Sequence, residues 1–322
     1  MSKNVSLKAI AMHLGVSINT VSHALRDLDD VSEATKSKVR KVAMEMGYMP
    51  NHVAQTMKSN ERPVVAVFVA GFSNPYFNTL NEEILKLFFE RNDFSLVFLC
   101  MPELNVEVIK QCVLQRVDLL VCFSSLDEKT ADFAQLNNIE IVCAGSFSDP
   151  ENKYDHVCVD DDSGCRLAAR YLFNPYYKGE YVYIGKNIYQ QIRLQFFKAE
   201  LTSLCSDVNI VNLDLNDDDI SDLCRRIDRG CRKIFCFNDE YAYKLLEKLD
   251  KHYTDVRRLY PDLDIVGFDA VGKYVCGLRR IPSVLIDYEQ VANEVYRLVE
   301  NRLKHPDSPL QQLELPVTLY RG

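Results

Sequence analysis

The chain has 322 residues, 47% of them hydrophobic, a length that predicts two or three domains with sizeable cores. No run approaches about 18 consecutive apolar residues, and the N-terminal MSKNVSLKA has no apolar region before a small-residue cleavage site, so we expect a cytoplasmic protein without a membrane span. The net charge of −8 is uneven, because residues 1–60 hold eight Lys or Arg against five Asp or Glu, and a basic head on an acidic body suggests that the head alone meets a polyanion.

The cysteines argue against several kinds of site. There are 11 of them, an odd number, scattered singly with no C-x-x-C pair. Several lie within or beside apolar runs, where a reduced thiol behaves as a small hydrophobic group. A disulfide framework, a zinc site and a catalytic cysteine are therefore all disfavoured.

The first sixty residues predict short helices joined by a tight turn. Ser6 is an N-cap residue before LKAIAMHL (residues 7–14), and Gly15 ends that helix. Ser17 is a second N-cap before INTVSHAL (residues 18–25). Two short helices around a glycine turn are the helix-turn-helix pattern, whose second helix enters the major groove of DNA.

A third helix is predicted from Val31-Ser32 onwards. The segment EATKSKVRKVAMEM (residues 33–46) carries its apolar residues on one side, and Gly47 ends it. Three such helices are enough to cover one small core.

The second helix buries little of itself, which leaves polar side chains for an outer surface. Asn19 can bond an adenine edge, Ile18 can pack on a thymine methyl, and His23 can donate to a guanine or a phosphate. Thr20 and the helix N-terminus suit a phosphate. A solvated polar face on a small bundle is the alternative. The candidate DNA contacts here are Ser17, Ile18, Asn19, Thr20, Ser22 and His23.

Residues 6–59 closely resemble the headpiece and hinge of LacI/GalR (lactose-repressor-type) transcription regulators. The resemblance is carried by SLKAIAMHLGVSINTVSHAL, VSEATKSKV and GYMPNHVAQTM. It implies a hinge that becomes helical only on operator DNA, in a dimer, and that pushes an apolar side chain into a minor-groove step. By this resemblance the hinge adds the DNA contacts Asn51, His52, Ala54 and Met57. Met57 stands where the family usually has Leu, and an ordinary linker role is its alternative.

From Pro63 onwards the pattern changes to alternating strands and helices. Short apolar runs such as PVVAVFVAG, FSLVFLC, DLLVCFSS and IEIVCAG alternate with amphipathic segments such as FNTLNEEILKLFFERN and EVIKQCVLQRV. The order repeats after VCVDDDSGCRLAARYLF with EYVYIG, KIFCFN and LDIVGFD. This alternation predicts parallel sheets covered on both faces, in two α/β lobes.

The order of these segments resembles the effector-binding core of the same family, a type I periplasmic-binding-protein-like fold. The fold class expected is therefore an N-terminal all-α helix-turn-helix headpiece with a hinge helix, followed by a two-lobed α/β core. The expected domains are a headpiece at 1–50, a hinge helix and linker at 51–62, and a core at 63–322. With crossings near 160, 287 and 316, the N-lobe is 63–160 plus 288–316 and the C-lobe is 161–287.

The candidate effector residues lie where strands end, which is where open α/β sheets bind ligands. Carried over from the resemblance, they are Phe72, Asn74, Tyr76, Phe77, Ser124, Arg193, Asn238, Asp269 and Asp287. Polar side chains suit the hydroxyls of a sugar and aromatic rings suit its apolar face, although a nucleobase would suit the aromatics equally well. Salt bridging is the alternative for Arg193 and Asp269, and relatives often carry Gln at the Asp287 position.

Asp160-Asp161-Asp162 precedes an apolar helix and is expected to cap it, with a divalent-metal or phosphoacceptor site as the alternative. No P-loop, G-x-S-x-G, H-E-x-x-H or Rossmann fingerprint occurs, so we expect no enzyme, cofactor or metal. The resulting prediction is a regulator, more often a repressor in this family, that acts as a homodimer on a near-palindromic double-stranded operator under a small effector, most simply a sugar. A constitutive DNA binder and a DNA-binding head on an α/β enzyme remain alternatives. No heptad tail follows LPVTLYRG, which favours a dimer over a tetramer.

Overall fold

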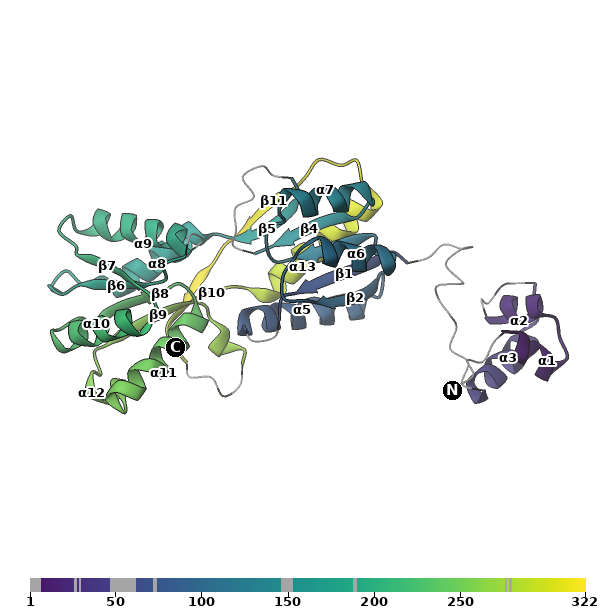
Figure 1. Ribbon diagram of the computed structural model, residues 1–322, viewed down its shortest axis with the longest axis horizontal. Coiled ribbons are helices and arrows are strands. Elements are labelled where there is room, and N and C mark those ends of the chain that lie inside the picture. Colours follow the sequence, from purple (N-terminus) through teal and green to yellow (C-terminus); the bar gives the residue numbers. More distant parts are fainter. Residues whose placement is uncertain are drawn as a thin grey trace. The chain divides into compact units, whose positions relative to one another are not determined.

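The computed structural model divides the chain into two compact units, Met1–Glu61 and Arg62–Gly322 (Figure 1). It describes residues 7–25, 28, 30–46, 62–71, 74–145, 153–187, 190–275, 277 and 280–322. We call the first unit the headpiece and the second the core, and describe each by itself.

The headpiece contains three helices in its described residues. They are α1 (Leu7–Leu14), α2 (Ile18–Leu25) and α3 (Glu33–Glu45), at the positions that the sequence predicts. Their buried residues form one small cluster of Ile10, Ala11, Val21, Ala24, Val39 and Ala43. Leu25 is half-buried against this cluster, whereas its smaller neighbour Ala24 is fully buried.

Local capping explains where these helices begin. Gly15 has φ 65°, a left-handed conformation that glycine adopts without a steric penalty, and it separates α1 from α2. The Ser17 Oγ accepts a hydrogen bond from the Thr20 backbone N–H at 3.0 Å, and the Ser32 Oγ accepts one from Thr35 at 3.3 Å. Both serines are therefore N-caps. The expected cap Ser6 lies outside the described residues.

One lobe of the core, the N-lobe, is built on a fully parallel six-stranded sheet in the order β11-β5-β4-β3-β1-β2. Its strands are β1 (Val64–Val69), β2 (Ser95–Cys100), β3 (Leu119–Cys122), β4 (Glu140–Ala144), β5 (Asp155–Val159) and β11 (Gln312–Leu315). Its helices are α5 (Pro75–Arg91), α6 (Val106–Leu114), α7 (Glu128–Leu136) and α13 (Tyr288–Lys304).

Alternation along β1 shows how helices cover both faces of this sheet. Val65 and Val67 belong to the same buried cluster as residues of α5 and α13. Ala66 and Phe68, pointing the other way, pack with residues of α6 and α7. Because successive side chains of a strand face opposite sides, a strand buried on both faces is continuously apolar.

The other lobe, the C-lobe, has a second six-stranded sheet in the order β12-β10-β9-β8-β6-β7, in which only the β10–β12 pair is antiparallel. Its strands are β6 (Tyr181–Ile184), β7 (Ile210–Leu213), β8 (Lys233–Cys236), β9 (Asp264–Asp269), β10 (Ser283–Leu285) and β12 (Thr318–Tyr320). Its helices are α8 (Asp161–Leu172), α9 (Gln190–Leu204), α10 (Asp217–Asp228), α11 (Asp239–Tyr253) and α12 (Val256–Leu259), with a 3₁₀ turn η1 (Val271–Lys273).

The chain passes between the two sheets three times: from β5 to α8, from β10 to α13, and from β11 to β12. The predicted fold class, a helical headpiece followed by two parallel α/β lobes, is confirmed. The strands β5, β7, β10, β11 and β12 were not predicted, and β10, β11 and β12 lie next to the crossovers between the lobes.

Candidate DNA interface and effector cavity

The outer surface of α2 carries the residues predicted to read DNA. Ile18 is 46% exposed, Asn19 is exposed, and His23 is half-buried near the end of the helix. The hydroxyls of Ser17 and Thr20 lie 2.8 Å apart in the first turn. Ser22 is half-buried on the same helix. All six predicted residues of this group are thus in or next to α2, whereas Asn51, His52, Ala54 and Met57 lie outside the described residues.

Beside α2 lies a shallow concavity of about 360 Å³ that reaches the first turn of α3. It is lined by Asn19, Thr20, His23, Asp30, Val31, Ser32 and Thr35. His23 Nδ1 lies 2.5 Å from Asp30 Oδ2, a hydrogen bond to a carboxylate across the α2–α3 connection. Asp30 was not singled out in the sequence, because nothing in the pattern places residue 30 beside residue 23.

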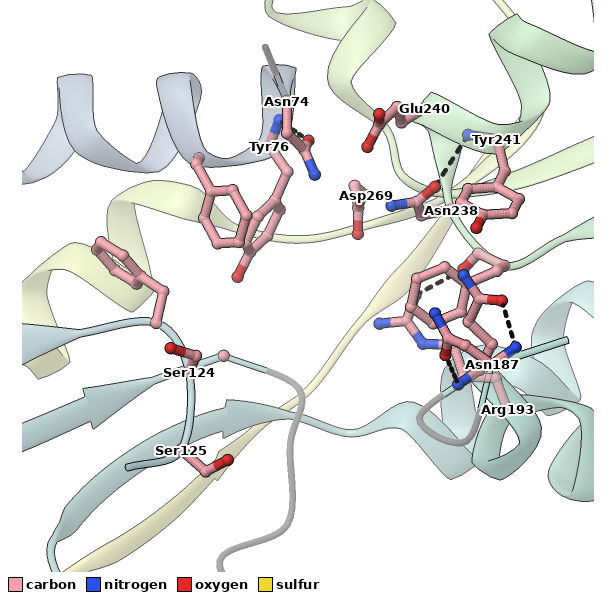
Figure 2. A pocket seen from close by; sticks show the side chains of 15 residues that line it. Asn74, Tyr76, Ser124, Ser125, Asn187, Arg193, Asn238, Glu240, Tyr241 and Asp269 are labelled. Atoms are coloured by element: carbon pink, nitrogen blue, oxygen red, sulfur yellow. Dashed lines mark hydrogen bonds between the residues drawn. The ribbon is translucent and has the colours of Figure 1, made fainter. Parts of the chain in front are cut away.

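A cavity of about 490 Å³ lies between the two lobes of the core (Figure 2). Seven of the nine predicted effector residues line it: Asn74, Tyr76, Phe77, Ser124, Arg193, Asn238 and Asp269. Four lie at or after the carboxyl ends of β1, β3, β8 and β9, as expected for parallel sheets. The others come from the first turns of α5 and α9.

Arg193 anchors the C-lobe side of the cavity. It is 4% exposed, its Nη2 lies 2.9 Å from Asp161 Oδ1, and its Nη1 donates to the Phe237 carbonyl oxygen at 2.7 Å. Its guanidinium stacks 3.6 Å from the Phe268 ring centre and 4.8 Å from that of Phe237. Burial opposes the charge, but the nearby Asp161 and Asp269 carboxylates raise the pKa of Arg193, so it remains a cation.

Asp269 is a buried carboxyl group that faces the cavity. It is 5% exposed, and among the described residues no hydrogen-bond donor reaches its carboxylate. Its φ of 103° is a conformation that non-glycine residues rarely adopt. Burial raises the pKa of Asp269 well above its ordinary value, and the Arg193 charge offsets this only in part.

Two amides face Asp269 from opposite lobes (Figure 2). Asn74 caps α5 by accepting from the Tyr76 N–H at 3.0 Å, and Asn238 caps α11 by accepting from the Tyr241 N–H at 3.0 Å. Each cap uses the amide oxygen, so the NH₂ group of each side chain is directed to the cavity. The sequence that ends a strand with Asn and starts a helix thus also supplies a ligand donor.

Asp239 stabilises the turn that carries Asp269. It is 1% exposed, its Oδ1 accepts from the Ser283 hydroxyl at 2.6 Å, and its Oδ2 accepts from the Val271 N–H at 2.8 Å. Burial raises the pKa of Asp239 to about 7, against the opposing effect of these hydrogen bonds. Because Val271 follows Asp269 by two residues, this network fixes the turn that carries Asp269.

The N-lobe side of the cavity is aromatic and less buried. Tyr76 and Phe77 form an edge-to-face pair with ring centres 5.1 Å apart, and Phe123 lies 5.8 Å from Phe77. Phe237 and Tyr241 make a similar edge-to-face pair, 5.9 Å apart, on the C-lobe side. A ligand in the cavity would therefore meet aromatic rings from both lobes.

Two predicted effector residues are not part of this set. Phe72 lies outside the described residues. Asp287 lines a different concavity, at the crossover into α13, where it caps that helix by accepting from the Gln290 N–H at 3.0 Å. The lining residues that the sequence analysis missed are Phe123, Ser125, Gly145, Asn187, Gln190, Phe237, Glu240 and Tyr241. Several are direct neighbours of predicted residues, a signal that could have found them.

Comparisons with known proteins bear on the headpiece and on the fold. The family model "Bacterial regulatory proteins, lacI family" matches residues 6–51. The HTH-type transcriptional repressor PurR of Vibrio parahaemolyticus serotype O3:K6 is 24% identical over 83% of this chain and 82% of its own. Residues 6–51 therefore match the DNA-binding region of the lacI family, and the chain as a whole is similar to regulators of that kind.

Solved structures of this family's fold resemble the whole chain. The lac repressor dimer bound to operator and the anti-inducer ONPF matches with a TM-score of 0.76, at 19% identity, over 99% of this chain and 98% of the other. A complex of the transcriptional regulator CelR with cellobiose matches with a TM-score of 0.63, at 21% identity, over 98% of each chain. At these identities the likeness concerns the fold.

These matches support a DNA-binding transcriptional regulator with an effector-binding core. No helix among the described residues is long and apolar enough to cross a membrane. Within the same residues no group of three or more His, Cys, Asp or Glu side chains could hold a metal ion. The Asp160 cluster is a helix cap there: Asp160 accepts from the Ser163 N–H at 2.8 Å, and Asp161 pairs with Arg193.

Proposed function

We propose that this chain is a LacI-family regulator, a dimeric, cytoplasmic repressor that reads a near-palindromic operator and responds to a sugar bound between the lobes of its core. The headpiece supplies base contacts through α2, centred on Asn19, and the hinge supplies the minor-groove contacts at Asn51, His52, Ala54 and Met57. The core supplies the effector site and the dimer surface.

The main support for a sugar effector comes from the carboxyl group of Asp269. A group that is 95% buried and has no donor among the described residues is costly unless a ligand supplies one. Adjacent hydroxyls of a sugar are paired donors that suit a carboxylate. The NH₂ groups of Asn74 and Asn238 then donate to oxygens of the same ligand.

The aromatic side chains are compatible with a sugar. Tyr76 and Phe77 meet at 73° and Phe237 and Tyr241 at 82°, so each pair offers one ring face and one ring edge to the cavity. A ring face can pack on the C–H surface of a puckered sugar ring, although it would also stack on a nucleobase. The CelR complex contains cellobiose in a chain of the same fold, which supports a saccharide here.

The coupling between effector and operator follows from the crossovers. The cavity is lined from both lobes, so a ligand that bridges Asn74 and Asp269 favours one spacing of the lobes. A change in that spacing moves the two lobes about the three crossovers. The N-lobe begins with strand β1, which directly follows the hinge in the sequence. A ligand can change operator affinity only by its differential affinity for the two lobe arrangements.

An exposed apolar surface on the N-lobe supports the dimer. Leu85 and Phe89 of α5 are 47% and 83% exposed, and Phe98 of the edge strand β2 is 39% exposed. Phe98 pairs in register with Val67, which faces α5, so these side chains lie on one side of the sheet edge. A patch of this kind, beside an unpaired edge strand, is covered most simply by a second copy of the chain.

Selection of the full-length protein against random duplex DNA tests the operator claim. A two-fold-symmetric motif, with half-sites about one helical turn apart, is expected. Binding without any enriched motif and with a steep salt dependence would mean that the headpiece senses phosphates only. A thermal-shift panel of sugars and nucleobases tests the effector separately, and stabilisation by nucleobases alone would replace the sugar.

A further inference from the structure

The α2–α3 connection places a carboxylate on the surface that meets DNA. Asp30 has a side chain 57% exposed and lines the same concavity as Asn19, Thr20 and His23. A carboxylate close to phosphates weakens binding to every sequence. Its presence there calls for a role that outweighs this repulsion.

The contact between Asp30 and His23 indicates such a role. The two groups lie 2.5 Å apart, Nδ1 to Oδ2, and the His23 side chain is 33% exposed. An ionised carboxylate only accepts hydrogen bonds, so the proton of this contact is on Nδ1. In the neutral form of the imidazole, Nε2 is then the nitrogen that can accept a hydrogen bond.

We propose that Asp30 is a specificity-positioning residue: it fixes the tautomer and direction of His23 so that Nε2 reads an exocyclic amino group, on adenine or cytosine, in the major groove. The inference rests on the proposed reading of the operator by α2. Adenine N6 and cytosine N4 are the donors that the major groove offers, whereas guanine and thymine present acceptors at the corresponding positions. Without Asp30 the ring can present either an acceptor or a donor, and the discrimination disappears.

A structural role alone would leave a different pattern. Asp30 lies two residues before the Ser32 cap of α3, where a negative charge also favours the positive end of that helix. Loss of such a charge would lower headpiece stability and weaken binding to all sequences equally. The proposed role predicts instead that removing Asp30 raises affinity for non-specific DNA while it lowers discrimination at one base pair.

The test uses the full-length protein and the operator that it selects from random DNA. The contact position is first located as the one whose preference is lost in His23→Ala. Affinities are then measured for the four base pairs at that position and for an unrelated duplex. The wild type is expected to prefer adenine or cytosine about fivefold, the value of roughly one base-edge hydrogen bond.

Two substitutions separate the hydrogen bond from the charge. Asp30→Ala removes both, and it should flatten the preference to within about twofold while tightening binding to the unrelated duplex. Asp30→Asn keeps an acceptor for Nδ1–H, so it should retain the preference and still tighten non-specific binding. Glu33→Gln is the matched control, because Glu33 lies in the first turn of α3 with a side chain 81% exposed and contacts Lys36 rather than His23.

A double substitution completes the test. In the His23→Ala background, Asp30→Ala should change the base preference no further, because the two residues act as one unit. The proposal is overturned if Asp30→Ala keeps the preference, if Asp30→Asn loses it as fully as Asp30→Ala, or if the wild type selects guanine. A clear operator that is indifferent at the His23 position would overturn this inference alone, whereas the absence of any selected motif would overturn the proposed reading of the operator as well.

Discussion

The two sides of the interlobe cavity differ in how firmly they are held. On the C-lobe side Arg193, Asn238 and Asp269 are 4%, 8% and 5% exposed and lie in or beside hydrogen-bonded networks. On the N-lobe side Tyr76, Phe77 and Phe123 are half-buried rings held by contacts with one another, and Ser124 is exposed. We infer that the two sides have different roles. The C-lobe side is ordered before the ligand binds and orients it, whereas the N-lobe side adjusts to the bound ligand.

The largest effect is expected at the centre of the organised side. Asp269→Ala should remove the hydrogen-bond partner of the sugar hydroxyls and lower effector affinity by about 100-fold, or about 3 kcal/mol, since it removes two hydrogen bonds worth roughly 1.5 kcal/mol each. Operator affinity without effector should stay unchanged. Titration calorimetry with the best-binding sugar measures the effector affinity. An effector affinity equal to that of the wild type would show that Asp269 is not part of the site.

The second-largest effect is expected on protein stability, at Gly267, which packs against Asp239. A Cβ added at Gly267 would lie 1.9 Å from Asp239 Oδ1, an atom held by Ser283. Gly267→Ala should therefore lower the free energy of unfolding by about 2 kcal/mol, the middle of the range for overpacking. Denaturant unfolding measures it. In an Asp239→Ala background the same change should cost much less, and full additivity of the two would argue against this contact.

Asp239 also predicts a pH dependence. Its pKa in the folded protein is about 7 against an ordinary value of 3.8, so the folded state binds this proton more tightly than the unfolded state does. Its contribution to stability is then complete below about pH 4 and is lost as the pH rises through 7, at a slope of up to about 1.4 kcal/mol per pH unit. Asp239→Asn should flatten this slope in thermal unfolding between pH 4 and 7. Parallel curves for the two proteins would show that another group titrates.

The smallest effect is expected on the aromatic side. Phe77→Ala should weaken sugar binding by about 1 kcal/mol, or roughly fivefold, because one of several rings is lost. Protein stability should change less than with Gly267→Ala, since Phe77 is only half-buried. If Phe77→Ala weakened the sugar as strongly as Asp269→Ala, the proposed division between the two sides would be wrong.

The sequence predicted the long elements well because their periodicity is strong. The headpiece helices begin where Ser17 and Ser32 cap them, and the apolar runs of β1, β8 and β9 lie where they were expected. The short strands near the crossovers were missed, since their pairing depends on segments far away in the chain. Strand β11, for example, pairs with β5 about 156 residues earlier.

The site was predicted only in part, because contacts between distant segments of the chain decide which residues meet. Asp269 is the last residue of one strand of the C-lobe sheet and Asp287 comes shortly after another, and the sequence alone does not tell them apart. Asp269 ends β9 and turns into the cavity, whereas Asp287 lies past β10 at a crossover and caps α13. Asp30 was missed because only the folded α2–α3 connection brings it to His23.

The most direct test of the account measures operator affinity with and without the best-binding sugar, for the wild type and for Asp269→Ala, by fluorescence anisotropy. For the wild type the sugar should change operator affinity at least about fivefold, the lower end of ordinary allosteric coupling, and for Asp269→Ala it should change nothing. An equal response in both proteins would place the effector elsewhere. No response in the wild type to any sugar that binds would contradict the coupling between cavity and operator.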